Sequence, residues 1–200
     1  EDPNEKDREE PLILIGEVQN LFSNSMCKLD SIKEVIQKLR FFSEGSHLKK
    51  DLVDVNGAVE FAVMMVEEIF KNRCKIEMSL GEIPFINGYK QEIIQMLLNF
   101  LNNAGESFIS DEPEKNSIKV STLYNNGFLE IVISDNGRGI DSEIREKIFQ
   151  PFFTSKNPDE HKGFGLVLST KIIKDHHGEL DFQSSKNVGT TFIIKIKGDE

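Results

Sequence analysis

The sequence has few of the features that mark secreted, membrane-spanning or disulfide-rich proteins. Its 200 residues include only two cysteines, Cys27 and Cys74, which lie far apart. We interpret them as reduced thiols of a cytosolic protein rather than as a disulfide framework. No apolar run approaches the length that spans a bilayer, and the run at residues 12–15 is too short for the core of a signal sequence. These absences predict a cytoplasmic protein.

Basic residues are also scarce. The chain has 24 Lys and Arg against 34 Asp and Glu, which gives a formal net charge of −10. Phosphate backbones need a basic face, so this balance excludes a general nucleic-acid binder. An acidic protein can still bind a nucleotide where a metal ion and backbone N–H groups meet the phosphates. Hydrophobic residues at 38% and charged residues at 29% predict a soluble globular chain with a core.

The first quarter of the chain indicates a linker followed by one helix. Residues 1–11 are acidic and typical of a linker or a disordered start, and residues 12–45 contain the helix and its polar end. The apolar residues that recur at three- and four-residue steps, which we call the seam, are Ile15, Val18, Phe22, Leu29, Ile32, Ile36 and Leu39. This spacing is typical of a coiled coil, with Ser25 as its single polar member. The seam must pack on the domain behind it, on another helix or on a second copy of the chain.

From residue 52 to residue 198 the pattern changes to alternating helix and strand signals, which predicts an α/β domain. The expected helices cover 59–70, 89–109 and 166–177, and the expected strands cover 75–80, 118–124, 128–134, 180–184 and 190–196. Turn signals at Asn125-Asn126-Gly127 and at Gly189 predict two β-hairpins. The region 135–165 is too long for an ordinary connection and is typical of a functional lid or binding loop.

The helix expected at 89–109 carries a polar stripe that includes three asparagines. Asn99 and Asn103 are four residues apart and therefore lie on the same face. The simplest interpretation is the solvated side of an amphipathic helix. However, asparagines cost helix stability that Glu or Lys would not. A carboxamide oxygen also suits Mg²⁺ that already carries phosphate charge.

A glycine-rich run with an acid follows the first expected hairpin. Its members of interest are Asp135, Gly137, Gly139 and Ile140. Two alternate glycines make a tight turn with exposed N–H groups. The Asp135 carboxylate can accept a hydrogen bond from an exocyclic amine such as that of adenine. An ordinary hairpin turn is the alternative, although the next segment is not a strand.

Three further motifs lie in the last quarter of the chain. The run 149–156 carries three phenylalanines, which are either core residues or the apolar anchor of a lid whose Lys156 reaches a phosphate. Gly163, Phe164, Gly165 and Leu166 stand at a helix start, where free N–H groups and the helix dipole favour an anion. Thr190 follows the turn at Gly189 and carries a hydroxyl that can reach a bound base. Each motif alone also fits ordinary turn chemistry.

Taken in order, these motifs resemble the nucleotide-site boxes of the GHKL superfamily of ATP-binding proteins. The matching segments are 99–104, 135–139, 151–156, 163–166 and 189–192, within a likeness that covers about residues 52–197. The run 149–156 is similar to the histidine-kinase branch, and Asn103-Ala104-Gly105-Glu106 with Pro-Phe-Phe-Thr to its nitrogen-regulation type. The resemblance implies a two-layer α/β sandwich: a mixed sheet with helices on one face, preceded by the coiled-coil-type helix.

The resemblance also implies an ATP or ADP site with Mg²⁺. Asn103 would bind Mg²⁺ through its side-chain oxygen, Asn99 would face the phosphates, and Asp135 would accept the adenine amine. The remaining implied contacts are Gly137, Gly139 and Ile140 near the base, Gly163, Phe164, Gly165 and Leu166 around the triphosphate, Lys156 at a phosphate, and Thr190 assisting Asp135 through water.

Three positions depart from the family pattern. Many kinases of this branch have a basic residue near Glu106, so that phosphate contact is absent here or supplied elsewhere. His161 stands where an additional glycine is common. Hydrolytic relatives of the gyrase type place a glutamate at the Asn99 position as the general base. Asparagine cannot accept that proton, so we expect no efficient intrinsic ATP hydrolysis.

A histidine kinase also needs a phospho-accepting histidine on a dimerisation helix. The four histidines, His47, His161, His176 and His177, all lie outside the seam helix, and the last two fit a helix end. Residues 12–45 resemble the second, non-accepting dimerisation helix, so we expect the acceptor outside this chain and no catalytic residue within it. The implied partners are ATP, an acceptor histidine domain and the receiver domain of a response regulator. A homodimer through residues 15–39 and a membrane-bound parent are both compatible with this interpretation.

Two other functions stay open. A kinase-like chain without its acceptor can act as a regulatory module that holds a partner through the seam, with ATP as a structural ligand. A serine kinase of the anti-sigma-factor type shares the superfamily, but it normally lacks the Pro-Phe-Phe-Thr run and the leading helix.

Overall fold

The computed structural model describes residues 50–156 and 163–198. The predictions for the linker 1–11, the helix 12–45 and the dimer contact 15–39 lie outside the described residues, as do His47 and His161. None of the helices in the described part is long and apolar enough to cross a membrane.

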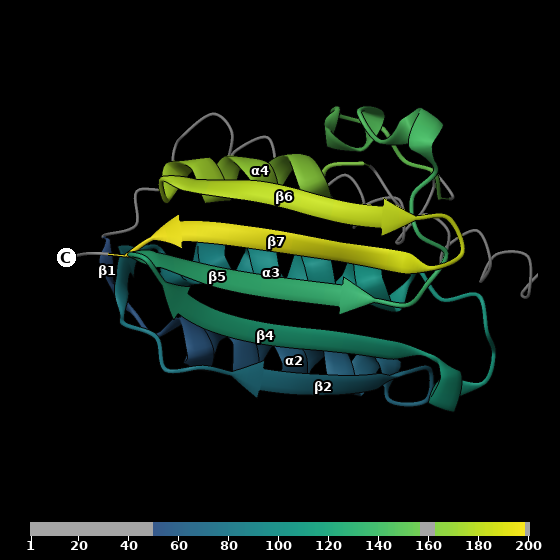
Figure 1. The fold of residues 1–200 in the computed structure, drawn as a ribbon, viewed down its shortest axis with the longest axis horizontal. Helices are drawn as coiled ribbons and strands as arrows, with labels where there is room; N and C mark the ends of the chain where they lie inside the picture. The colour runs from purple at the N-terminus through teal and green to yellow at the C-terminus, as the bar shows by residue number, and fades with distance from the viewer. Residues whose placement is uncertain (1–49, 157–162, 199–200) are drawn as a thin grey trace, which may run out of the picture. The chain divides into compact units, whose positions relative to one another are not determined.

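One mixed sheet of five strands forms one layer of the domain (Figure 1). In spatial order its strands are β2 (Lys75–Leu80), β4 (Ser117–Asn125), β5 (Phe128–Asp135), β7 (Gly189–Lys197) and β6 (Gly178–Ser185). β2 runs parallel to β4, and every other pairing is antiparallel. Both expected hairpins are therefore present. Sequence analysis missed a small antiparallel pair, β1 (Asp51–Val53) with β3 (Ile86–Gly88).

Three helices cover one face of this sheet and form the second layer (Figure 1). They are α2 (Val55–Phe70), α3 (Lys90–Gly105) and α4 (Gly165–Asp175). Short 3-10 helices lie at η1 (Pro113–Lys115), η2 (Ser142–Ile144) and η3 (Lys147–Phe149). The predicted two-layer α/β sandwich is thus confirmed for the described residues.

The core lies between α3 and the middle strands. Leu129, Ile131 and Ile133 alternate along β5 and point at the helices, each at most 2% exposed. Phe100 of α3 meets Phe192 of β7 with ring centroids 4.8 Å apart. Replacing one of the branched β5 side chains by alanine lowers the free energy of unfolding by about 2–5 kcal/mol.

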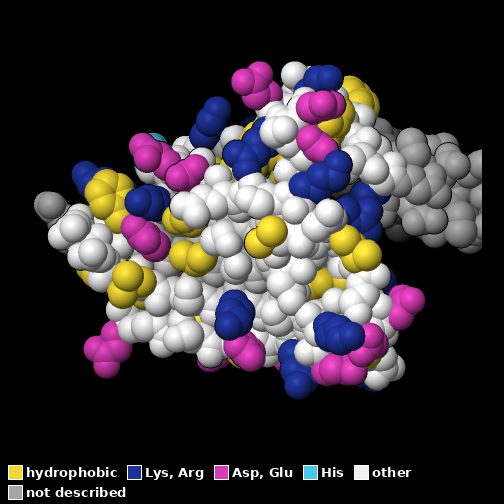
Figure 2. Space-filling view, turned by 45° about the vertical axis from the view of Figure 1, so that its right-hand side comes forward, with side chains coloured by type: hydrophobic (Ala, Val, Ile, Leu, Met, Phe, Trp, Pro, Cys, Tyr) yellow, Lys and Arg dark blue, Asp and Glu magenta, His cyan; other side chains and the backbone are white. Residues whose placement is uncertain are grey.

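The other face of the sheet carries charged pairs. Glu130 on β5 and Lys195 on β7 are cross-strand neighbours with a 3.2 Å contact. Figure 2 views this face obliquely and shows its hydrophobic side chains scattered between charged ones. Within the described residues, the helical layer is therefore the side on which the core forms.

The observed ends of α2 and α3 differ from the expected ones. α2 starts four residues early because the Asp54 carboxylate accepts the Gly57 N–H at 3.0 Å, which caps the helix. α3 ends at Gly105, four residues early. A Cβ at Gly105 would lie 2.7 Å from the Phe70 ring, so the close approach of α2 requires glycine there. This early end takes Ser107 out of the helix.

Candidate nucleotide-binding site

Segments that lie far apart in the sequence meet where β5 ends and β7 begins, at the right-hand end of Figure 1. Asp135 on β5 pairs in register with Thr190 on β7. Hydrogen bonds join the other motifs, namely Ser107 with Asp135, Asn99 with Gly165, and Lys156 with Asn103. The structure therefore brings all five sequence motifs to one place.

The asparagine stripe on α3 is not simply a solvated face. Asn99 is half-buried, and its Nδ2 donates to the Gly165 carbonyl and to the Ser169 hydroxyl, each at 3.2 Å. Asn103 is also half-buried, and its Oδ1 accepts from the Lys156 ammonium at 3.5 Å. Gln95 and Gln91, four and eight residues before Asn99 on the same helix, are exposed in the manner of an ordinary helix surface.

Asp135 is held as a partly buried acceptor at the end of β5. Its Oδ1 accepts from the Ser107 hydroxyl at 2.9 Å and from the Gly137 N–H at 2.8 Å. Burial raises the pKa of this carboxyl above its ordinary value. The Gly137, Ser107 and Thr190 hydrogen bonds and the Lys156 charge act in the opposite direction. Because an ionised carboxylate has about four lone-pair sites, Asp135 retains capacity to accept a ligand N–H.

The two glycines after Asp135 are required by the protein's own packing. A Cβ on Gly137 would lie 1.8 Å from the Ser107 hydroxyl oxygen. Gly139 has a φ of +64°, and a Cβ there would lie 2.0 Å from the Ser185 carbonyl oxygen. The resemblance explained these glycines by the approach of a base. The structure adds a reason that operates without a ligand.

Thr190 contacts both Ser184 and Asp135. Ser184 accepts the Ile140 N–H at 2.8 Å and donates to the Gly189 carbonyl at 3.0 Å. Since Ser184 has one hydroxyl proton, the Thr190 hydroxyl is the donor in the 2.9 Å bond between them. Thr190 therefore supports Asp135 through its backbone N–H, and its hydroxyl fixes Ser184.

The start of α4 presents backbone N–H groups. α4 begins at Gly165, and its N-cap Phe164 provides no side-chain hydrogen bond. Gly163 has a φ of +70°, and a Cβ there would lie 2.5 Å from the Phe153 carbonyl oxygen. An uncapped helix start favours an anion, as the sequence predicted for residues 163–166, with Leu166 half-buried in the first turn.

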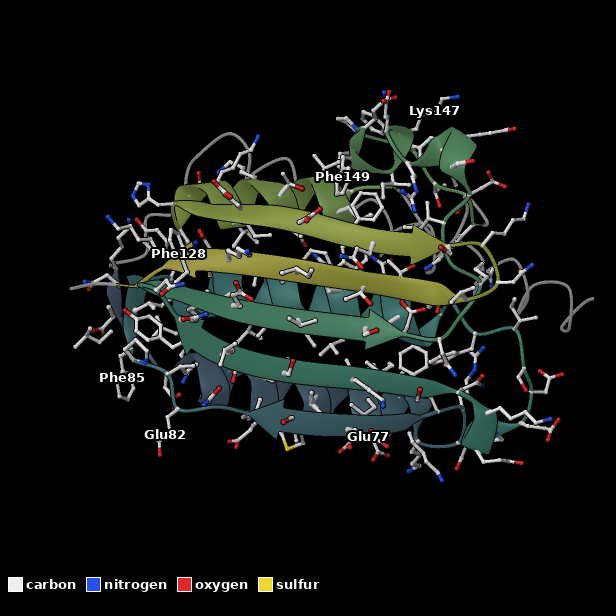
Figure 3. The ribbon with its side chains drawn as sticks, viewed as in Figure 1. Glu77, Glu82, Phe85, Phe128, Lys147 and Phe149 are labelled. Atoms are coloured by element: carbon white, nitrogen blue, oxygen red, sulfur yellow. The ribbon has the colours of Figure 1, made fainter. Side chains whose placement is uncertain are left out.

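The three phenylalanines of the run 149–156 are not core residues, because none is buried. Phe149 packs edge-on against Phe182 of β6 with centroids 5.6 Å apart, and Figure 3 shows it beside that strand. Phe152 is 72% exposed at a φ of +66° and packs edge-on against Phe164. Of the two interpretations offered by the sequence, apolar anchoring of a loop fits these positions better.

His176 has a structural role. Its ring is buried at the end of α4, where Nε2 accepts the Tyr89 N–H at 2.9 Å and Nδ1 lies 2.8 Å from the Ile172 carbonyl. One acceptor and one donor nitrogen are the pattern of a neutral imidazole. His177 follows in a left-handed turn at a φ of +55°. Both residues follow the last turn of α4, at the opposite end of this helix from Gly165.

Sequence reasoning missed Ser107 and Ser184. Ser107 was assigned to the helix 89–109, and only the observed end of α3 at Gly105 frees it to reach Asp135. Ser184 faces Thr190 across the β6–β7 hairpin, a register that the predicted strands already contained. A hydroxyl opposite Thr190 was thus a signal that could have been used.

Comparison with known proteins identifies the class. The family described as histidine kinase-, DNA gyrase B- and HSP90-like ATPase matches residues 88–200. The match covers more than half of the chain and contains every site residue named above, so the chain belongs to this family. It is an ATP-binding domain with the fold of the histidine-kinase branch.

The similar proteins are sensor kinases. The signal transduction histidine-protein kinase AtoS of Escherichia coli is 34% identical over 88% of this chain and 28% of its own length. The sensory histidine kinase/phosphatase NtrB of Rhizobium leguminosarum is 26% identical over 82% of this chain and 46% of its own. The chain thus spans less than half of either relative. Neither supports the anti-sigma-factor alternative.

Solved structures agree on the fold. The catalytic domain of histidine kinase ThkA has a TM-score of 0.65 and 26% identity, over 76% of this chain and 97% of that one. Full-length ShkA, solved in complex with AMPPNP, has a TM-score of 0.77 over 92% of this chain and 39% of that one. At 17% identity, ShkA shows the fold alone.

Proposed function

We propose that this chain contains the catalytic domain of a two-component sensor histidine kinase. It transfers the γ-phosphoryl group of Mg–ATP to a histidine outside the chain, for relay to an aspartate on a response regulator. The observation that supports this best is the hydrogen-bonded Asp135, set at the strand end that faces the C-terminal half of α3 and the start of α4. A carboxylate that can bind the adenine base and free backbone N–H groups that can bind phosphates then lie in one site.

Each motif takes one part of the nucleotide. Asp135 accepts the adenine amine, with Gly137, Gly139 and Ile140 beside the base and Thr190 steadying the acid. Asn99 and the α4 start, residues 163–166, face the phosphates. Lys156 supplies a positive charge near the terminal phosphate.

Asn103 is the proposed Mg²⁺ ligand. Its Oδ1 already points at a cation, the Lys156 ammonium, so the atom is oriented as a metal ligand must be. Residues 50–156 and 163–198 contain no group of three or more His, Cys, Asp or Glu side chains suited to a metal ion. The metal would therefore complete its shell with phosphate oxygens and water, and when bound it neutralises phosphate charge.

Transfer by this site is a matter of position and charge. Phosphoryl transfer needs alignment and neutralisation more than covalent chemistry by the protein. Asn99 cannot act as a general base for water, so ATP is conserved for the acceptor. We further propose a cytoplasmic position, acceptor and receiver domains as partners, no nucleic-acid partner, and a homodimer through residues 15–39.

Nucleotide affinity tests the site. Asp135→Asn keeps the shape but replaces an acceptor by an amide, so titration with an ATP analogue and Mg²⁺ should show a loss of about tenfold or more. The control is Asp175→Asn, because Asp175 is exposed and pairs with Lys171 at the last turn of α4, the opposite end of that helix from Gly165. Undiminished affinity in Asp135→Asn would refute the site.

Phosphorylation in trans tests the reaction. The chain should show no stable self-labelling from radiolabelled ATP, but it should label a supplied acceptor-helix domain with an acid-labile phosphate. Acid-stable labelling would favour serine. A partner held through the seam independently of nucleotide, without transfer, would favour the regulatory module.

A further inference from the structure

One ion pair at the edge of the site joins residues that are far apart in the sequence. The Lys156 ammonium lies 2.5 Å from the Glu106 carboxylate and 3.5 Å from Asn103 Oδ1. Glu106 follows Asn103 by three positions, so both acceptors come from the same side of the α3 end. Lys156 therefore bridges the run 149–156 to the helix that carries the proposed metal ligand.

This pair differs from the ordinary surface pairs of the domain. Lys71–Glu68 and Lys115–Glu112 join residues three apart, and all four side chains are more than half exposed. The Lys156 and Glu106 side chains are only 22% and 30% exposed. A sheltered, long-range pair is screened less by solvent and constrains where the ammonium lies.

The ammonium contacts the same oxygen atom that is proposed to bind Mg²⁺. An amide oxygen that coordinates a metal at about 2 Å leaves no room for an ammonium on the same side, and the two cations repel each other. Lys156 and the metal must therefore exchange at Asn103. Glu106, by contrast, places a negative charge beside the phosphate position and competes with the phosphates for the ammonium.

We propose that Lys156 is a built-in substitute for the metal at Asn103 and that the Glu106 carboxylate restrains it, by competing with the phosphates for its ammonium. The inference rests on the proposed nucleotide site and assigns a use to the departure at Glu106. Without metal, Lys156 supplies the positive charge that the terminal phosphate meets. With metal, Lys156 leaves Asn103, and its contribution to nucleotide affinity falls.

The measurable consequence is a ratio that we call the magnesium ratio. It is the dissociation constant of a non-hydrolysable ATP analogue in excess EDTA divided by that in saturating Mg²⁺, at one ionic strength. A purely structural role for the pair would weaken binding equally in both conditions and leave the ratio unchanged. Calorimetric titration gives both constants without any turnover.

Two single variants should move the ratio in opposite directions. Lys156→Met removes the substitute cation, so the ratio should rise about tenfold, chiefly through weaker binding in EDTA. Glu106→Gln removes the competing charge, so the ratio should fall about threefold. Lys115→Met and Glu112→Gln, from an exposed pair with the same 2.5 Å contact, are the matched controls and should not change it.

The charge-reversed double variant, Lys156→Glu with Glu106→Lys, keeps a pair but moves its cation to α3. It should restore the ratio to within about threefold of the unchanged chain. The inference is overturned by a Lys156→Met ratio within about twofold of the unchanged chain. It is also overturned if Glu106→Gln moves the ratio in the same direction as Lys156→Met. A chain that binds no nucleotide in either buffer would instead refute the proposed function.

Discussion

Gly137→Ala separates two explanations of the glycine after Asp135. If Gly137 only makes room for a base, the substitution harms ligand binding and leaves the free protein unchanged. The structure predicts damage to the free protein, because the new Cβ would lie 1.8 Å from Ser107 Oγ, 2.6 Å from Ser107 Cβ and 2.7 Å from the Ser107 carbonyl oxygen. The Ser107 carbonyl is itself anchored, since it accepts the Arg138 N–H at 2.9 Å.

The expected loss in the free energy of unfolding follows from the crowding caused by one added methyl group. Overpacking by one methyl group costs about 1–3 kcal/mol. At about 2–4 °C per kcal/mol for a domain of this size, Tm should fall by roughly 2–12 °C. Ser107→Gly removes two of the three conflicting atoms. Gly137→Ala should therefore cost about 1 kcal/mol less in a Ser107→Gly background than in the unchanged chain.

The assay is thermal and denaturant unfolding of the four chains of this double-mutant cycle, without nucleotide. Affinity for an ATP analogue is measured in parallel. An unchanged Tm in Gly137→Ala, with lost affinity, would refute the packing argument and return the glycine to the ligand. Strict additivity of the two substitutions would show that Ser107 is not the obstacle.

Two other substitutions have effects that can be worked out from the same site. Gly165→Ala adds a Cβ 3.8 Å from the nearest Asn99 atom, which is ordinary contact. The free energy of unfolding should therefore stay the same or rise by up to about 1 kcal/mol from helix propensity. Nucleotide affinity should fall. A large loss of Tm in Gly165→Ala would contradict the open space at that position. Asp135 should make stability depend on pH: its folded pKa is raised above 3.8 by burial, so its protonated form favours the fold, and its contribution is lost as pH rises through the folded pKa. The stability of Asp135→Asn minus that of the unchanged chain should therefore increase as pH rises from about 4 to 7, and a flat or falling difference in urea unfolding would contradict it.

Local patterns carried most of the fold. Alternation in β4 and β5, with Asn126-Gly127 at the turn, predicted all four strand ends of this hairpin to within one residue. The strands β1 and β3 have three residues each, which is too short for any period to be recognised. The glycine at the end of α3 is required by the close contact with Phe70, a tertiary feature that periodicity does not contain.

The site was predictable where its chemistry is local and not where it depends on long-range contacts. Asp135 with its glycines is a local motif and was found as one. Ser107 reaches Asp135 across 28 positions, and Lys156 reaches Glu106 across 50. The sequence showed Glu106 only as a missing basic residue. The structure shows a basic side chain placed beside that position from another segment.

Asn99 offers a physical reason for the proposed preference for transfer to a histidine over hydrolysis. Its amide nitrogen donates to the Gly165 carbonyl and to Ser169, so this side chain also joins α3 to the start of α4. A glutamate at this position, as in the hydrolytic relatives, has no proton to donate when ionised and would face the Gly165 carbonyl oxygen with a negative charge. Losing both bonds would loosen the N–H groups that are proposed to meet the phosphates. The absence of a general base and the integrity of the phosphate site are therefore one property of this residue, which fits a domain that keeps its phosphoryl group for an acceptor on another domain.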